Sequence, residues 1–189
     1  MITTVDVETS WQRNENGGYD PSPFHPDNIL VSVGINDEYY FTNHSERIDK
    51  GCFHKIQSVL DKTSLLVGHN IKFDLMWLLE SGFKYSGRVY DTMLGEYVLN
   101  RGVRKSLTLE MSCRRRRIGS KDSRIKEFTD RGIPFQDIPV DLVEEYGRID
   151  VEITRRLFDS QMGDLKMAKN KGLLMTLKMM NEFLIVLSD

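Results

Sequence analysis

Two carboxylates stand two residues apart in the first strand-like stretch of the chain, Val5-Asp6-Val7-Glu8-Thr9. Because side chains alternate across a strand, Asp6 and Glu8 should point to one face while the two valines point to the other. Adjacent negative charges repel each other, so a purely structural strand would avoid this pattern. A divalent cation removes the conflict, because hard cations prefer carboxylate oxygens. The stretch therefore predicts a metal site on which further carboxylates converge.

The length of 189 residues is enough for one domain with its own core. No apolar run approaches the roughly 18 residues that a membrane-spanning helix needs, so no membrane span is expected. Strand-like sequence with acidic residues begins at once, which argues against a signal peptide. The two cysteines, Cys52 and Cys113, have no metal-type partner in the sequence and favour a reducing, cytoplasmic setting.

The net charge of −2 is unevenly distributed. Residues 101–131 hold 11 Lys/Arg against 4 Asp/Glu, a local charge of +7, so the remainder carries −9. A basic segment on an acidic chain is typical of a protein that meets phosphate on one face and holds metals on another. The four arginines Arg114–Arg117 cannot all face one way on a helix. They predict a charged surface and not a fixed pocket, used either for DNA backbone contact or as a solvated helix end.

The N-terminal part predicts a long irregular loop followed by a hairpin. Residues 9–27 are rich in Asn, Gly, Pro and Ser and show no apolar period. The Trp11, Tyr19 and Phe24 rings of this loop either stack on bases or pack on the domain's own surface. Strands over 28–35 and 39–42 are joined by a short turn, and an amphipathic helix with Ser45 as its N-cap follows.

A third candidate carboxylate lies in the middle of the chain. A short apolar strand over 64–68 leads into a helix that should end at Gly82. Asn70 and Asp74 are four residues apart at its start, so both can face the strand ends. His69 has a structural or supporting role on this interpretation.

The next stretch predicts a strand over 85–90 and then a helix through Val98. Asp91 between them is either the N-cap of that helix or a group near the metals, and the cap is favoured. A helix that starts within 106–111 follows, and residues 118–139 read as irregular with one short helix near 123–130.

A fourth carboxylate comes from a strong helix after Pro139. Asp141 and Glu144 resemble a capping box at its start. Tyr146 and Asp150 are four residues apart on one face, which places a phenol beside a carboxylate.

The last stretch, residues 161–189, is helical, Met-rich and more apolar than a free surface needs. Either it meets a following domain or a partner, or it packs back onto this domain.

Strands alternating with helices predict an α/β fold with a mixed sheet, in which sites gather at the carboxyl ends of strands. Asp6, Glu8, Asp74 and Asp150 can all converge there. Each carboxylate alone could occur by chance in such a strand or helix. Together, in this order and on these elements, the four predict an active site.

Three motifs in the chain resemble those of a known superfamily. They are Val5-Asp6-Val7-Glu8-Thr9, Asn70-Ile71-Lys72-Phe73-Asp74 and Tyr146-Gly147-Arg148-Ile149-Asp150. They look like the three exonuclease motifs of the DEDD superfamily of 3′–5′ exonucleases. Tyr146 in the third motif resembles the tyrosine of the DEDDy branch, where the other branch has histidine. Tyr90–Leu94 and Met179–Leu187 also resemble the proofreading domains of family A DNA polymerases, the latter where such a domain leads into the polymerase.

The resemblance implies a ribonuclease H-like mixed sheet flanked by helices. It implies an exonuclease domain over residues 1–160. Residues 161–189 would be a helical extension that leads towards an absent polymerase domain or packs on the exonuclease domain. It further implies a monomer from a bacterial or phage-infected cell that takes the single-stranded 3′ end of DNA, beside a polymerase domain or subunit.

The implied reaction uses two divalent ions, Mg²⁺ or Mn²⁺, about 3.5–4 Å apart across the scissile phosphate. By resemblance, Asp6 bridges the ions, Glu8 and Asp150 complete one of them, and Asp74 helps to hold the other. Tyr146 would orient the attacking water. Thr9 and Asn70 match positions near the terminal nucleotide, and the product would be a nucleoside 5′-monophosphate. Without metals the carboxylates would repel, so at least one should have a raised pKa.

Two other functions stay open. An exoribonuclease of the same superfamily would use the same carboxylates and tyrosine, and would differ by a partner for the 2′-hydroxyl. A non-catalytic nucleic-acid-binding module would be expected to lose carboxylates, whereas all four remain. A phosphate-loop nucleotidase is not supported, because the chain has no G-x-x-x-x-G-K-S/T motif.

Overall fold

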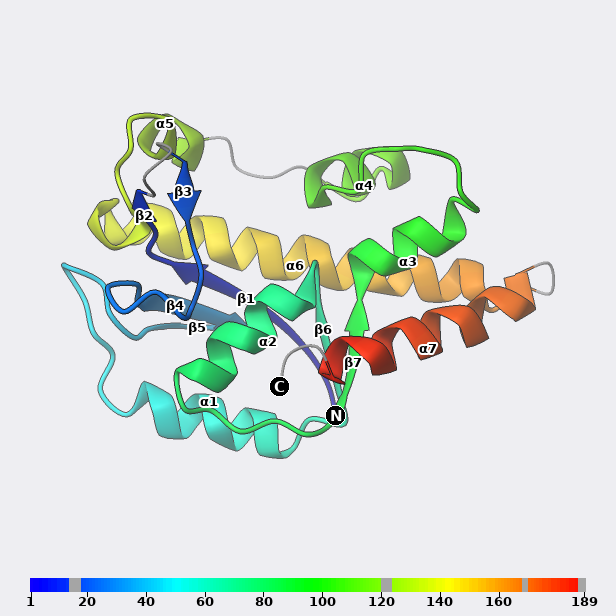
Figure 1. The fold of residues 1–189 in the computed structure, drawn as a ribbon, viewed down its shortest axis with the longest axis horizontal. Helices are drawn as coiled ribbons and strands as arrows, with labels where there is room; N and C mark the ends of the chain where they lie inside the picture. Colours follow the sequence, from blue (N-terminus) through cyan, green and yellow to red (C-terminus); the bar gives the residue numbers. More distant parts are fainter. Residues whose placement is uncertain (14–17, 120–123, 168–169, 187–189) are drawn as a thin grey trace.

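A five-stranded mixed sheet forms the centre of the computed structural model, which describes residues 1–13, 18–119, 124–167 and 170–186 (Figure 1). The strand order is β5-β4-β1-β6-β7. The strands are β1 (Ile2–Thr9), β4 (Leu30–Ile35), β5 (Glu38–Phe41), β6 (Leu65–Gly68) and β7 (Arg88–Asp91). β4 is antiparallel to β1 and β5, while β6 and β7 follow the direction of β1. This arrangement confirms the predicted α/β fold with a ribonuclease H-like mixed sheet.

Helices cover the sheet, and the longest of them, α6, runs across the length of the molecule (Figure 1). The helices are α1 (Cys52–Asp61), α2 (Ile71–Glu80), α3 (Thr92–Leu99), α4 (Leu109–Arg116), α5 (Arg124–Asp130), α6 (Val140–Leu165) and α7 (Lys171–Val186). A 3-10 turn, Phe135–Asp137, precedes α6. Both α4 and α5 contact α6. Among the residues that the structure describes, no helix is both long enough and apolar enough to cross a bilayer.

The alternation of β1 assigns its two faces as the sequence predicts. Val5 and Val7 are buried in the core that α1 and α2 close, against residues such as Ile56. Asp6 and Glu8 point to the other face, over which α6 passes. The helix approaches closely there, since a Cβ on Gly34, the register partner of Asp6, would lie 2.7 Å from Val151 Cγ2.

The expectation of an irregular loop over residues 9–27 is wrong in part. Two short strands, β2 (Gln12–Arg13) and β3 (Tyr19–Asp20), pair as a separate small sheet. The Trp11 and Tyr19 rings lie 4.1 Å apart and join its two arms. At the base, Ser10 N–H donates to Ile29 O over 3.0 Å, and Ile29 N–H donates to Ser10 Oγ over 2.7 Å. Two-residue strands are too short to show an alternating pattern, so no strand is predicted for this part of the chain.

Ser45 is not the N-cap of the first helix. α1 begins at Cys52, after Gly51 with φ of 70°. The Ser45 hydroxyl instead donates to Asp137 Oδ1 over 2.6 Å, in the 3-10 turn 92 residues further on. A serine that caps locally and one that bonds a distant carboxylate look the same in sequence.

The capping box predicted for the later helix is also wrong. α6 begins at the residue after Pro139, so Asp141 already lies in its first turn and is not the N-cap. The Val140 N–H at this end donates instead to Glu46 Oε2 over 3.3 Å. Glu144 forms ion pairs with Arg47, over 2.9 Å, and with Arg148, over 2.7 Å. The carboxylate is therefore engaged by guanidinium groups and not by the helix terminus.

Other predicted ends are confirmed. Asp91 caps α3, because its Oδ1 accepts the Met93 N–H over 2.8 Å. α2 ends just before Gly82, whose φ is 90°. The hairpin of β4 and β5 and the short helix α5 lie close to where the sequence predicts them.

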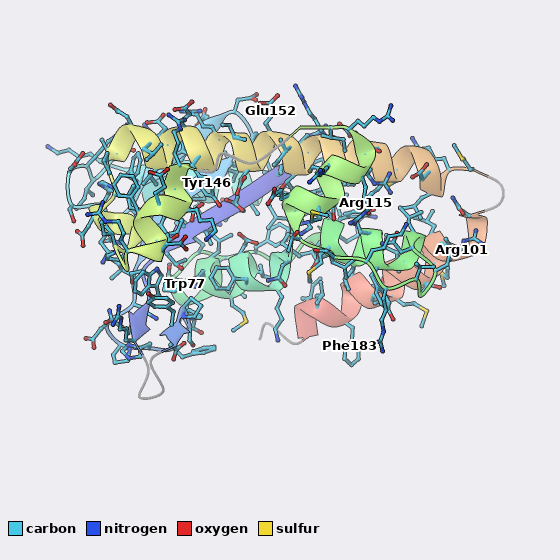
Figure 2. The ribbon with its side chains drawn as sticks, turned by 90° about the horizontal axis from the view of Figure 1, so that it is seen from above. Trp77, Arg101, Arg115, Tyr146, Glu152 and Phe183 are labelled. Carbon is cyan, nitrogen blue, oxygen red and sulfur yellow. The ribbon has the colours of Figure 1, made fainter. Side chains whose placement is uncertain are left out.

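The C-terminal stretch packs on the sheet with one face only. Leu177 is buried, and Asn181 Oδ1 accepts the Asp91 N–H over 2.9 Å. Met175, Met179 and Phe183 on the other face are 61–64% exposed, and Figure 2 shows Phe183 projecting away from the molecule. α6 continues through residue 160, and the division of the chain at that point stays a prediction.

Candidate active site

Three carboxylates from two distant elements meet at the centre of the molecule. Asp6 and Glu8 come from β1, and Asp150 comes from α6. Each offers one oxygen within 4.8 Å of those of the other two. Glu8 and Asp150 are buried and Asp6 is half-buried. The structure thus brings together three of the four carboxylates that the sequence singles out.

The fourth carboxylate, Asp74, lies at the edge of β1 on the first turn of α2. Pairing of β1 with β6 ends at Thr4, so the Val7 N–H beyond that point has no strand partner on this side. Asp74 Oδ1 accepts it over 3.0 Å. Burial, and then the charge of Asp6, raise the pKa of Asp74 well above its ordinary value. This confirms that at least one carboxylate has a raised pKa.

Tyr146 lies one turn before Asp150 on the same helix (Figure 2). Its hydroxyl hydrogen-bonds the Asp150 carboxylate. Burial first, and then the charges of Glu8, Asp150 and Asp6, raise the pKa of Tyr146 far above its usual value. The phenol therefore carries its proton at neutral pH and acts as a hydrogen-bond donor.

Tyr39, a buried tyrosine that sequence reasoning missed, packs between β4 and α6 beside these residues. Tyr39 Oη lies 2.8 Å from Ser32 Oγ, and Ser32 is the register partner of Glu8. Burial, followed by the Glu8 charge, raises the pKa of Tyr39. A Cβ on Gly147 would lie 2.3 Å from the Tyr39 ring, so only glycine lets α6 come this close. Y-G in a helix gave no signal of this contact, because the partner ring is more than 100 residues away.

The two predicted binding residues flank the carboxylates. Thr9 follows Glu8 at a shift of register between β1 and β4, and it is buried. Asn70 is exposed at the start of α2, in the left-handed region with φ of 63°. Its backbone N–H donates to Asp91 Oδ1 over 3.0 Å, which fixes this turn. Their roles in substrate binding stay predictions.

His69 has the structural role that the sequence suggests. Its Nδ1 lies 2.9 Å from Thr92 Oγ1 and its Nε2 lies 2.8 Å from Leu107 O. The ring thus joins the start of α2 to the start of α3 and to the segment before α4.

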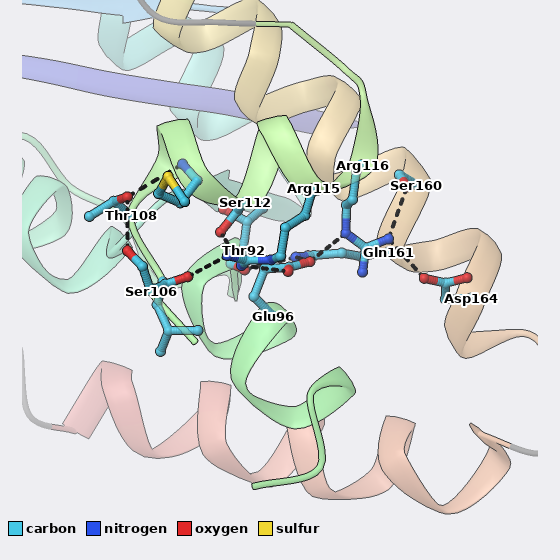
Figure 3. A network of polar contacts seen from close by, with 12 residues as sticks. Thr92, Glu96, Ser106, Thr108, Ser112, Arg115, Arg116, Ser160, Gln161 and Asp164 are labelled. Atoms are coloured by element: carbon cyan, nitrogen blue, oxygen red, sulfur yellow. Dashed lines mark hydrogen bonds and ion pairs between the residues drawn. The ribbon is translucent and has the colours of Figure 1, made fainter. Parts of the chain in front are cut away.

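The arginine run divides into inward and outward residues, which corrects the prediction of a purely exposed surface. Figure 3 shows Arg115 and Arg116 converging on Glu96 of α3. The ion-pair distances to Glu96 are 3.1 Å from Arg115 and 2.5 Å from Arg116. Arg116 also binds Asp164 over 2.8 Å, and Gln161 Nε2 donates to Glu96 Oε1 over 3.1 Å. The pair is fixed because a buried carboxylate, distant in sequence, requires compensation.

The carboxylate cluster has the chemistry of a divalent-cation site. Asp6, Glu8 and Asp150 supply three hard oxygen donors around one point, and Asp74 adds a fourth beside them. Mg²⁺ and Mn²⁺ favour such ligands. The residues therefore fit the metal that their mutual repulsion predicts.

The model of a 3′–5′ exonuclease family, DNA_pol_A_exo1, matches residues 15–165 of the chain. The chain belongs to this 3′–5′ exonuclease family. The matched range holds Asp74, Tyr146 and Asp150, whereas Asp6 and Glu8 precede it. The exonuclease is thus of the DEDD type that its motifs resemble. No curated protein sequence matches it.

Solved structures share the fold of this exonuclease at low sequence identity. Brucella melitensis NrnC bound to pGG superposes with a TM-score of 0.71 and 17% identity, covering 99% of this chain and 82% of that one. The catalytic core of RRP6 from Trypanosoma brucei gives a TM-score of 0.61 and 12% identity, over 97% and 45%. The family B DNA polymerase from the archaeon Pyrobaculum calidifontis gives 0.58 and 17%, over 85% and 24%.

Proposed function

We propose that the chain is a metal-dependent 3′–5′ exonuclease that removes nucleoside 5′-monophosphates from the single-stranded 3′ end of DNA. The convergence of Asp6, Glu8 and Asp150 within 4.8 Å, with Tyr146 on Asp150 and Asp74 on Val7, carries the proposal. The match to a 3′–5′ exonuclease family supports degradation from the 3′ end. A polymerase domain or subunit as partner is part of the same proposal.

The carboxylates would hold two divalent ions, which supply an activated hydroxide and stabilise charge on the leaving 3′ oxygen. A solved complex of NrnC carries Mg²⁺, which supports this choice of ion. In the proposed roles, Asp6, Glu8, Asp74 and Asp150 are the ligands. The burial of Glu8, Asp74 and Asp150 keeps water from one side of the site.

The chain's own residues then hold and orient the reactants. Tyr146 keeps its proton and does not act as the general base. In the proposed role its O–H donates to the Asp150 carboxylate, and its oxygen accepts a hydrogen bond from the attacking water. Thr9 and Asn70 would contact the terminal nucleotide on either side. Unpairing the terminal nucleotide costs the least free energy where its base is mismatched. This difference would let the enzyme select mismatched ends for removal.

RNA is the second candidate substrate. NrnC, a structural neighbour, is described as bound to pGG, and this supports a test with short oligonucleotides of both sugars. Discrimination between the two requires a partner for the 2′-hydroxyl. The name of the matched family favours DNA.

The test is digestion of 5′-labelled single-stranded DNA and RNA of one sequence, with Mg²⁺ or with EDTA, by the wild type and by Asp6→Asn. We expect a ladder that shortens from the 3′ end of DNA, needs Mg²⁺ and is absent with the variant. Faster decay of RNA would assign the exoribonuclease function. Absence of metal-dependent cleavage of both by a folded protein would contradict the proposed activity.

A further inference from the structure

Around α4, the basic segment has exposed cations besides the two inward arginines. Arg104, Lys105, Arg114 and Arg117 are exposed, and we call these four residues the basic lip. In the described part of the chain, none of the four forms an ion pair with a carboxylate. Other cations of the basic segment do form ion pairs: Arg124 pairs with Glu145 over 2.6 Å and Lys126 with Asp130 over 2.6 Å.

The local charge is not compensated by neighbouring acids. Glu110 is the one acidic residue among residues 101–119. Glu96, the nearest buried carboxylate that the segment contacts, is already bound by Arg115 and Arg116. The basic lip therefore keeps its positive potential on a chain whose net charge is −2.

The segment that carries the basic lip is held beside the carboxylates at two points. His69 Nε2 bonds Leu107 O over 2.8 Å, next to the turn of Asn70 that opens α2. Arg115 Nη1 donates to Ser106 O over 2.7 Å, which ties the same segment to α4.

The second point of attachment is on α6. Leu109 and Cys113 on the buried face of α4 pack on Ile153 and Leu157 of that helix. Ile153 lies one turn beyond Asp150. α4 and its preceding segment thus bridge the two helices that bring Asp74 and Asp150 to the site, and the basic lip lies on their outer side.

We propose that the basic lip binds the phosphate backbone of a single-stranded nucleic acid on the 5′ side of the terminal nucleotide. This rests on the proposed function, because an exonuclease that holds the 3′ end at the carboxylates must let the rest of the strand leave past a flank of the site. Lys and Arg side chains bind phosphate with release of counterions and without sequence preference. The basic lip therefore confers a preference for longer strands and not for a base.

The experiment compares a dinucleotide, which offers no backbone phosphate beyond its own linkage, with a twelve-nucleotide strand of the same base. The variant Arg104→Ala/Lys105→Ala removes two cations of the basic lip. The matched control, Arg155→Ala/Lys178→Ala, removes two exposed cations that are ion-paired with Asp159 and Glu182 on other surfaces. Both variants change the net charge equally. The readouts are kcat/KM for each substrate with Mg²⁺, and anisotropy of the labelled twelve-mer in EDTA at several salt concentrations.

We expect the gain in kcat/KM from the dinucleotide to the twelve-mer to fall roughly tenfold in the lip variant, and to keep the wild-type value in the control. The slope of log affinity against log salt should become shallower by about 1 to 1.5, since a single strand contributes about 0.7 per phosphate contact.

An unchanged gain and an unchanged salt slope in the lip variant would overturn the proposal while leaving the exonuclease function intact. An equal loss on both substrates would also overturn it, because these residues would then act at the site itself. Absence of hydrolysis by the wild type, with binding that still depends on the basic lip, would contradict the proposed function and support the basic lip.

Discussion

At the scale of single residues, the hydroxyl of Tyr146 offers the sharpest test of the site. It bonds Asp150, and its pKa is raised by burial and by three carboxylates. Tyr146→Phe removes the donor and leaves the ring. We expect kcat to fall by roughly 100-fold, with a small change in KM, because the lost contact orients the attacking water and not the strand. Steady-state kinetics on the twelve-mer measures both constants.

Tyr40→Phe is the matched control. Its hydroxyl bonds Glu38, and its ring packs in the core on the opposite face of the sheet. Activity within about twofold of the wild type is expected for this control. A Tyr146→Phe enzyme that is equally active would remove the tyrosine from the mechanism.

Asp91 gives a prediction for pH dependence. Burial raises its pKa, and the N–H groups of Asn70 and Met93 offset only part of that effect. The folded protein therefore binds this proton more tightly than the unfolded chain. The stabilisation is complete below the unfolded pKa of about 4 and is lost as the pH rises through the folded pKa. Asp91→Asn keeps the Oδ1 acceptor, so its free energy of unfolding should fall less between pH 4 and pH 7 than that of the wild type.

Urea titrations in EDTA at pH 4, 5, 6 and 7 measure this difference. Asp61→Asn, at the exposed end of α1, should follow the wild-type curve. Parallel curves for Asp91→Asn and the wild type would show that the burial of Asp91 is balanced by its hydrogen bonds.

Sequence reasoning at this scale succeeds where the signal is local. The alternation within β1 predicts the shared face of Asp6 and Glu8, and helical spacing predicts the pairing of Tyr146 with Asp150. It fails where the partner is distant. Arg115 and Arg116 point inward because they bind Glu96. That carboxylate lies on another helix, so the sequence around the arginines does not predict the contact.

At the scale of elements, the approach of α6 to the sheet decides where Tyr146 and Asp150 lie. The Cβ of an alanine at Gly147 would meet the rigid, buried ring of Tyr39 at 2.3 Å. Gly147→Ala should therefore push the helix and the ring apart. We expect a loss of roughly 1–3 kcal/mol in the free energy of unfolding, together with a loss of activity, as the two carboxylate-bearing elements separate. Chemical denaturation and the oligonucleotide assay report the two effects.

Gly163→Ala on the same helix is the control. A Cβ there meets nothing within 4 Å, and the position is exposed. Alanine should stabilise this site by about 0.5–1 kcal/mol through helix propensity, with full activity. A Gly147→Ala protein that gains stability in the same way would show that the close approach does not constrain α6.

Element existence follows from local pattern, but element ends depend on tertiary partners. The strands of the central sheet and the long helix are visible from periodicity, whereas the two-residue strands β2 and β3 are not. Ser45 and the Asp141–Glu144 pair look like caps, yet the structure uses Ser45 and Glu144 to connect distant segments. Cap residues and tertiary hydrogen-bond donors are the same residue types, so sequence alone does not separate the two uses.

At the scale of the whole molecule, the site is assembled from β1, α2 and α6, whose carboxylates are up to 144 residues apart in the chain. The free energy that brings like charges together comes from apolar packing of these same elements, in the core that holds β1 and α2 and in the cluster between α4 and α6. The protein should therefore be less stable without metal than with it, since the cation removes the repulsion that folding creates.

Thermal unfolding with and without Mg²⁺ tests this coupling. A cation that binds the folded state stabilises it by about 2.7 kcal/mol at a concentration 100 times its Kd. For a chain of this size that corresponds to a rise in Tm of about 5–10 °C. Asp150→Asn removes one of the three converging charges, so it should melt higher than the wild type in EDTA and gain less from Mg²⁺. Asp159→Asn, an exposed carboxylate on the same helix, should show the full wild-type rise. A wild-type Tm that does not respond to Mg²⁺ or Mn²⁺ would show that the three carboxylates do not bind a cation in the folded protein.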